Sequence, residues 1–415
     1  MKIWKVRFWR LVIVSAFSAV YLLKNPLTIK GEETQISDAP SVYAQAAVLM
    51  DGENGRVLYG KNEEQILPMA STTKIMTCIV TLEQAEPDEI VEVSEYAASM
   101  PDVQLNMKEG ESYHLKDLLY SLMLESHNDS AVAIAEHVAG SQAAFADLMN
   151  QKARDLGCIH THFVTPNGLD AVDEESGAFH GTTAEELAKI MRYCVFQSPK
   201  RDEFLEITRA PSYAFSDLDR TRSFSCINHN TLLTSMEGAM SGKTGFTNKA
   251  GYCYVGAVER GEKQFICALL ACGWPPNKSY KWQDMRKLIT FGDEQYDFYD
   301  LGRGSVEIRD IPVENGIIDF VKIEVVDDDV KEEGEDVVAR VLMRPDESIT
   351  VRKMIKKNIQ APVTKGMCVG QMEYRLGDIM IACIPIITAE EVEEWNPEFC
   401  LKTLLNRYLF CYNAG

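Results

Sequence analysis

Positive charge is scarce in this chain of 415 residues. It has 42 lysines and arginines against 62 aspartates and glutamates, which gives a formal net charge of −20. Six of the basic residues and none of the acidic ones fall within the first 30 positions, so residues 31–415 carry a net charge of −26. Binding to a phosphate backbone needs a basic face. The composition therefore argues against nucleic acid as a partner.

The cysteines lack any regular pattern. Eleven are scattered along the chain without a single Cys-x-x-Cys, and an odd number argues against a dense disulfide framework. Cys78, Cys267 and Cys383 lie in apolar runs, which predicts mostly buried thiols. His160 and His162 follow Cys158, but this spacing matches no common zinc pattern. We assign no metal and expect no cofactor.

A long apolar run is missing from the N-terminus. Residues 11–23 are apolar apart from two serines and a tyrosine, and four basic residues precede them. Thirteen residues suit a signal segment and are short for a membrane span. An uncleaved anchor at the membrane and a cleaved signal peptide both remain open, and either one predicts an exported protein. Residues 1–42 are thus interpreted as this segment plus a polar tether from residue 24.

The rest of the chain has a globular composition, with 46% hydrophobic and 25% charged residues. Its length favours two domains. From Tyr43, residues 46–50 and 56–59 predict two strands around a turn, and residues 251–259 and 264–273 predict a hairpin. Helical spacing and capping residues predict further helices. They are expected from Ser71 onward and at residues 115–124, 130–138 after an Asp129 cap, 143–156 before Gly157, 187–193 after a Thr183–Glu186 capping box, and 282–291 before Gly292.

The pattern of apolar and polar residues changes beyond about residue 303. Apolar alternation and β-branched runs separated by acidic or Gly/Pro turns predict a small all-β domain over residues 304–388. Residues 389–415 predict an amphipathic helix with an aromatic apolar face and only two basic residues. This segment either lies on a membrane surface or packs on the β domain.

Ser71 and Lys74 form the pattern around which the chain is organised. On a helix, residues three apart share a face, so the Lys74 amine can reach the Ser71 hydroxyl. A serine becomes a good nucleophile only when a base takes its proton, and lysine can do so only when neutral. Burial and a second cation both lower the pKa of a lysine. The helix N-terminus also offers N–H groups to an oxyanion.

Two further motifs follow in a fixed order. Ser126-His127-Asn128 lies in a loop between predicted helices, and Lys243-Thr244-Gly245-Phe246-Thr247 precedes the predicted hairpin. Together with Ser71-x-x-Lys74, they resemble the motifs of the active-site serine penicillin-recognising proteins. The last motif and the pieces 47–51, 167–170 and 250–252 are most similar to the low-molecular-weight D-alanyl-D-alanine carboxypeptidases. The resemblance covers residues 43–300.

This resemblance implies a fold and an activity. The fold would be α+β, with a β-lactamase/transpeptidase-like domain at residues 43–302 in which an antiparallel sheet carries helices on both faces beside a helical subdomain. The small β domain would follow it. The enzyme would be extracytoplasmic and would remove the terminal D-alanine from peptidoglycan pentapeptides through an acyl-enzyme that β-lactams also form.

The resemblance also assigns roles to residues. It implies that Ser71 is the nucleophile, Lys74 the general base and Ser126 a proton relay to the leaving amine. Asn128 would hold the substrate amide and Lys74. Lys243 would keep Lys74 neutral through its positive charge and would anchor Ser126. The rest of the substrate-binding set would be the carboxylate-binding hydroxyls of Thr244 and Thr247, the strand residue Gly245, and Phe246, whose N–H completes the oxyanion hole with that of Ser71.

The chain departs from the family at two places. The arginine that often binds the substrate carboxylate is absent, and Lys278 or Lys281 stands nearest, with spacing favouring Lys281. His127 replaces a small residue, and we expect its side chain to turn toward solvent because its two neighbours must face inward.

Other activities were weighed on the same residues. A class A β-lactamase needs a glutamate with an asparagine four residues on, and Glu174 and Glu175 lack it. A non-catalytic wall-binding scaffold would have no need to keep all of Ser71, Lys74, Ser126 and Lys243. Endopeptidase or transpeptidase activity stays open, because the acyl acceptor depends on the shape of the cleft.

Overall fold

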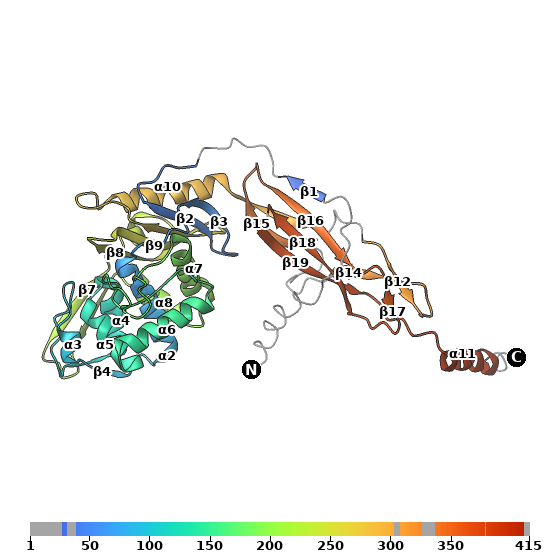
Figure 1. Cartoon of the computed structure of the whole chain (residues 1–415), viewed down its shortest axis with the longest axis horizontal. Helices are drawn as coiled ribbons and strands as arrows, with labels where there is room; N and C mark the ends of the chain where they lie inside the picture. The colour runs from blue at the N-terminus through green and yellow to red at the C-terminus, as the bar shows by residue number, and fades with distance from the viewer. Residues whose placement is uncertain (1–26, 31–38, 303–307, 326–336, 378, 411–415) are drawn as a thin grey trace. The chain divides into compact units, whose positions relative to one another are not determined.

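The computed structural model describes residues 27–30, 39–302, 308–325, 337–377 and 379–410. The chain divides into two compact units (Figure 1). One, the peptidase unit, spans Ser37–Gln295, and the other, the β unit, spans Tyr296–Gly415 together with residues up to Ile36. The predicted N-terminal signal or anchor segment lies outside the described residues. Among the described residues, no helix is long and apolar enough to cross a membrane.

A five-stranded antiparallel sheet forms the centre of the peptidase unit. Its order is β3-β2-β10-β9-β8. The strands are β2 (Ala46–Asp51), β3 (Val57–Lys61), β8 (Ala239–Thr247), β9 (Gly251–Arg260) and β10 (Lys263–Leu270). The predicted hairpin is confirmed, since β9 and β10 pair from Arg260 and Lys263 outward. β8, which carries the third motif, lies at one edge of the sheet.

Helices cover both faces of this sheet, as the resemblance implied. Alternate residues of a strand point to opposite faces. Val48, Met50 and Ile266 belong to the main core, against which α7 (Ala184–Arg192) packs. α10 (Tyr280–Gln295) packs on the same strands from the opposite side (Figure 1).

Gly292 was predicted to follow the last helix of the peptidase unit, and this prediction is wrong. Gly292 lies inside α10. A Cβ at this position would lie 2.8 Å from Leu49 Cδ2 and 2.9 Å from Phe265 Cε1. The glycine therefore allows a close approach of helix and sheet, which local sequence does not reveal.

The remaining helices gather on the α7 side as a helical region (Figure 1). The central helix α2 (Lys74–Gln84) has nine buried residues among its eleven, which fits its apolar sequence. Around it lie α4 (Leu115–Tyr120) continued by the π-helical turn η3 (Ser121–Glu125), α5 (Asn128–Ala139), α6 (Gln142–Asp155), α8 (Arg201–Arg209) and the π-helical turn η4 (Tyr193–Gln197). Smaller elements are η2 (Ala70–Thr73), β4 (Ile90–Glu92), α3 (Glu95–Ala98), β5 (Ser112–His114), β6 (Ser212–Ser216), β7 (Ser223–Ile227) and α9 (Leu232–Ser235).

The capping predictions met different outcomes. Thr183 caps α7, because its hydroxyl accepts the Glu186 N–H at 3.1 Å. The Glu186 carboxylate accepts instead from His160 N–H and from the Thr161 hydroxyl. Asp129 is not the N-cap of α5, which begins at Asn128; its buried carboxylate accepts the N–H groups of the preceding loop at residues 105 and 107.

The β unit is built on a second five-stranded sheet, ordered β1-β16-β18-β19-β14. β1 (Leu27–Lys30) pairs with β16, so residues 27–30 are not tether as predicted. The all-β prediction is confirmed, although the strand from Ile379 was missed. The elements are β11 (Asp297–Gly302), β12 (Ile311–Glu314), β13 (Phe320–Val321), β14 (Ile323–Val325), β15 (Val337–Met343), β16 (Ser348–Ile355), β17 (Ile359–Gln360), β18 (Cys368–Leu376), β19 (Ile379–Thr388) and α11 (Pro397–Phe410).

Candidate active site

Ser71 lies in the short helical turn η2, directly before α2. Ala70 has a left-handed φ of +49°, which is rare for a residue other than glycine. This backbone turn precedes the serine, which is partly exposed, whereas Lys74 is fully buried. Lys74 Nζ lies 3.1 Å from Ser71 Oγ, so the two side chains meet as their spacing predicted.

Three oxygen atoms surround the Lys74 amine. Besides Ser71 Oγ, these are Asn128 Oδ1 at 2.9 Å and the Asn167 carbonyl at 2.6 Å. Burial lowers the pKa of Lys74 well below its usual value, and the nearby Lys243 lowers it further, against a smaller opposing effect of Asp129. A neutral amine has two hydrogens and one lone pair. The two carbonyl oxygens can accept both hydrogens, which leaves the lone pair for the Ser71 hydroxyl.

The second motif places Ser126 and Asn128 at the start of α5. Asn128 is held rigidly, since its Nδ2 donates to the carbonyls of Pro101 and Asp102, each at 3.1 Å. Ser126 has a left-handed φ of +71°. Among the described residues its buried Oγ has no hydrogen-bond partner. This hydroxyl is therefore available to a bound group.

His127 does not turn toward solvent, so that expectation is wrong. The side chain is 9% exposed, and its Nδ1 lies 2.8 Å from Ser121 Oγ, which also contacts Ser130 Oγ. Burial lowers the pKa of His127. The expectation assumed that neighbouring side chains alternate, as in an extended chain. The left-handed backbone at Ser126 breaks this alternation.

The third motif lies on the edge strand β8, beside the serine turn. A Cβ at Gly245 would lie 3.0 Å from the Ser71 nitrogen, so strand and turn are in close contact. Lys243 is buried, and burial lowers its pKa to about 7. Its amine donates to the Thr244 carbonyl at 3.1 Å, whereas Ser126 Oγ has no partner among the described residues, so the implied anchoring of Ser126 by Lys243 is wrong. Thr247 Oγ1 accepts the Ala250 N–H at 3.0 Å.

Lys281 lies at the start of α10 and is buried against aromatic rings. Its Nζ is 4.7 Å from the Tyr252 ring centroid and 4.8 Å from that of Trp282. It donates to the Lys278 carbonyl at 3.0 Å, and burial lowers its pKa to about 8. The Tyr252 ring lies 4.7 Å from that of Phe246. The predicted carboxylate-binding lysine is thus separated from the third motif by one aromatic ring.

Three residues of this site, namely Thr73, Asn167 and His180, were assigned no role from the sequence. The Asn167 carbonyl contacts Lys74, and Thr73 Oγ1 lies 2.7 Å from His180 Nε2. These contacts join positions 93 and 107 residues apart, so no local spacing indicates them.

His162, considered and rejected as a metal ligand, lies 3.2 Å from Asp173. The described residues contain no group of three or more potential metal ligands.

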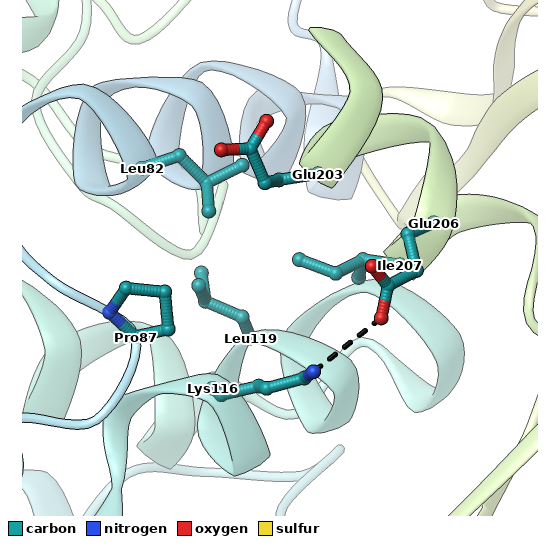
Figure 2. Close-up of a pocket in the computed structure, with 7 residues that line it drawn as sticks. All are labelled: Leu82, Pro87, Lys116, Leu119, Glu203, Glu206 and Ile207. Atoms are coloured by element: carbon teal, nitrogen blue, oxygen red, sulfur yellow. Dashed lines mark hydrogen bonds and ion pairs between the residues drawn. The ribbon is translucent and has the colours of Figure 1, made fainter. Parts of the chain in front are cut away.

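A separate small pocket opens between α2, α4 and α8 (Figure 2). Its walls are largely apolar, and an ion pair of 3.4 Å joins Lys116 and Glu206 at its rim. None of the predicted site residues lines it. The lining residues are Leu82, Pro87, Lys116, Leu119, Glu203, Glu206 and Ile207.

The antiparallel sheet and the serine–lysine pair define a serine acyl-transfer enzyme of the penicillin-recognising fold. Comparison with known families matches residues 33–272 to D-alanyl-D-alanine carboxypeptidase and residues 306–394 to the C-terminal domain of penicillin-binding protein 5. The first match covers more than half of the chain. This chain therefore belongs to the D-alanyl-D-alanine carboxypeptidase family.

Individual relatives agree with this assignment. D-alanyl-D-alanine carboxypeptidase DacF of Bacillus subtilis is 28% identical over 85% of this chain and 86% of its own length. DacC of Escherichia coli is 29% identical over 92% of both chains. The crystal structure of penicillin-binding protein 5 from Haemophilus influenzae covers 86% of this chain and 100% of its own, with a TM-score of 0.67 and 25% identity.

The predicted activity is confirmed by these relationships. The protein is a serine-type D-alanyl-D-alanine carboxypeptidase, a hydrolase that acts on peptidoglycan stem peptides and is acylated by β-lactams. Its place of action is the cell envelope, where this substrate lies. A relative, penicillin-binding protein D2 from Listeria monocytogenes, was solved in a cefotaxime-bound form, with 29% identity over 62% of this chain, 100% coverage of that chain and a TM-score of 0.54.

Proposed function

We propose that Ser71 is the acylated nucleophile of this carboxypeptidase and Lys74 its general base. The observation that carries this proposal is the set of three oxygen atoms around the Lys74 amine. Asn128 and Asn167 occupy the two N–H bonds of the neutral amine. The remaining lone pair is directed at the Ser71 hydroxyl, and a neutral lysine at this distance can accept the proton.

The acylation step follows from this arrangement. The Ser71 proton passes to Lys74 Nζ while Oγ attacks the carbonyl carbon of the penultimate D-alanine. The oxygen that becomes negative is stabilised by the N–H groups of Ser71 and Phe246, which β8 and the serine turn bring together. The C–N bond to the terminal D-alanine then breaks, and its nitrogen receives the proton from Lys74 Nζ through the Ser126 hydroxyl.

Deacylation and substrate binding complete the cycle. Water attacks the Ser71 ester, releases the shortened stem peptide and restores the hydroxyl. Lys243 supplies positive charge near Lys74, which lowers the pKa of Lys74 and favours its neutral form. The hydroxyls of Thr244 and Thr247 and the amine of Lys281 bind the substrate carboxylate, while Gly245 lets β8 approach the serine.

The domain boundaries and the membrane contacts belong to the same proposal. Residues 43–302 carry the catalytic domain and residues 304–388 the small β domain. The basic and apolar residues 1–23 are either a cleaved signal peptide or an uncleaved anchor that holds the chain at the membrane. α11 presents Leu401, Leu404 and Leu405, each about half exposed or more. Such an apolar helix suits a membrane surface.

The test compares wild type with Ser71→Ala and, as a matched control, Ser99→Ala in an exposed turn. Covalent labelling by a fluorescent penicillin and D-alanine release from a diacyl-D-Ala-D-Ala peptide are both measured. We expect Ser71→Ala to abolish both and Ser99→Ala to change neither. Labelling of Ser71→Ala would show that another residue is the nucleophile.

A further inference from the structure

His180 lies between the two segments that meet at the reacting groups. It is 2% exposed. Its neighbours Gly181 and Thr182 form bridges to His162 and Leu67, so the segment is fixed on both sides. One side leads to the serine turn at residues 70–74, and the other leads to the loop at residues 164–169.

The hydrogen bonds assign both nitrogens of the His180 ring. Nδ1 accepts the backbone N–H of Val164 at 3.0 Å and that of Thr165 at 3.3 Å, so it carries no proton. The proton of the neutral ring is therefore on Nε2, which donates to Thr73 Oγ1 at 2.7 Å. Burial lowers the pKa of His180 to about 3, with smaller effects of His162 and Lys74, so the ring stays neutral.

Each ring nitrogen connects to one partner of the serine–lysine pair. On one side, Thr73 Oγ1 donates to the Ala70 carbonyl at 2.8 Å and so holds the left-handed turn before Ser71.

On the other side, Thr165 Oγ1 accepts the Gly168 N–H at 3.2 Å and stabilises the loop whose Asn167 carbonyl contacts Lys74. The two segments also touch directly, since a Cβ at Gly168 would lie 2.1 Å from the Ala70 oxygen. A chain of hydrogen bonds thus runs from the Ser71 turn through His180 to the carbonyl that orients the Lys74 amine.

We propose that His180 is a positioning residue, which clamps the Ser71 turn to the Asn167 loop and thereby fixes the Lys74 amine relative to the Ser71 hydroxyl. This inference rests on the proposed roles of Ser71 and Lys74. His180 touches no reacting atom. Its effect is expected on the acylation step, because a displacement of about 1 Å between reacting groups can slow a reaction about 100-fold.

The test removes the hydrogen bond between His180 Nε2 and Thr73 Oγ1 in two ways. In His180→Asn, the amide oxygen can replace Nδ1 as acceptor, but the donor to Thr73 is lost. In Thr73→Val, the acceptor is lost and the volume is kept. We expect each variant to lower the acylation rate with fluorescent penicillin about 10- to 100-fold. kcat for D-alanine release should fall similarly, with KM little changed.

The double variant tests the coupling. Both changes remove the same hydrogen bond, so we expect the double variant to be about as slow as the slower single variant. Losses that multiply would overturn the proposal, as would wild-type acylation in either single variant. If His180→Asn fails to fold, Thr73→Val against Thr73→Ser decides the same question, because serine keeps the hydroxyl and should restore the rate.

Two controls separate this inference from the proposed function. His160→Asn changes an exposed histidine whose backbone N–H, not its ring, contacts Glu186, and it should acylate at the wild-type rate. Persistent labelling of Ser71→Ala would overturn the proposed roles themselves. Loss of labelling in Ser71→Ala together with full-rate acylation in His180→Asn would overturn the clamp alone.

Discussion

The two units of this protein differ in what they bury. The peptidase unit buries the amines of Lys74, Lys243 and Lys281, together with many other polar side chains. In the β unit, among the residues whose burial is described, Thr388 is the one polar residue that is buried, and the other buried residues are hydrophobic. Burying an amine costs free energy unless the group is neutral or well paired. Buried amines in the peptidase unit are what the proposed catalytic and binding roles of these lysines require, whereas the β unit follows ordinary core packing.

The largest effect in a test of this contrast is expected for Lys74→Arg. A guanidinium keeps its proton in proteins, so it cannot act as the general base that we propose at this position. We expect the rate of penicillin acylation to fall about 10³-fold, within the range usual for loss of general base catalysis. Lys365→Arg in the β unit, at an exposed position, should leave the rate unchanged. Comparable losses in both variants would remove the distinction between the units.

The next largest effect is expected from substituting two glycines that have the same backbone conformation but different surroundings. Gly168 has φ +85° and faces the Ala70 oxygen, whereas Gly366 in the β unit has φ +82° with nothing within 4 Å. Gly366→Ala should lower the free energy of unfolding by about 1 kcal/mol, from backbone strain alone.

Gly168→Ala adds a clash with the backbone, so we expect it to lower the free energy of unfolding by about 3 kcal/mol and to slow acylation. Denaturant unfolding of each variant and its penicillin acylation rate measure the two effects. Equal losses of stability in the two variants would contradict the tighter packing at the active site.

Lys281→Ala tests whether the third buried amine binds substrate. Removal of a carboxylate-binding cation should raise KM for the peptide about 10-fold and lower kcat much less, because the contact is present before the reaction begins. Steady-state D-alanine release gives both constants. Lys278→Ala is the matched control. An unchanged KM in Lys281→Ala would transfer the role to Lys278 or to the threonines.

The smallest effect concerns pH. In the proposed mechanism, acylation needs Lys74 neutral and Lys243 charged, which predicts a bell-shaped dependence of the rate on pH. Lys243 is charged below its pKa of about 7, so the rate should fall as pH rises through that value. In Lys243→Arg the side chain stays charged, and the alkaline limb should move to higher pH. Lys108→Arg, at an exposed position, should leave the profile unchanged. An alkaline limb that stays in place would assign it to another group.

Local sequence predicted well the features that depend on short spacing. The i, i+3 relation of Ser71 and Lys74, the Thr183 cap and the hairpin of β9 and β10 all involve residues near one another in the chain. The errors at His127 and Gly292 have a different origin. A left-handed backbone at Ser126 and the close approach of α10 to the sheet depend on tertiary contacts.

The sequence by itself determined the family, the two kinds of core and the contact between Ser71 and Lys74, because motif order, alternation and helical spacing are properties of the chain. The resemblance also implied the contact between Asn128 and Lys74, whereas only the tertiary structure placed the Asn167 carbonyl at the Lys74 amine. Asn128, Asn167 and Lys243 come from distant segments, and His180 joins the Asn167 loop to the Ser71 turn. Their convergence follows from packing, which burial and backbone geometry fix and which no spacing in the sequence encodes.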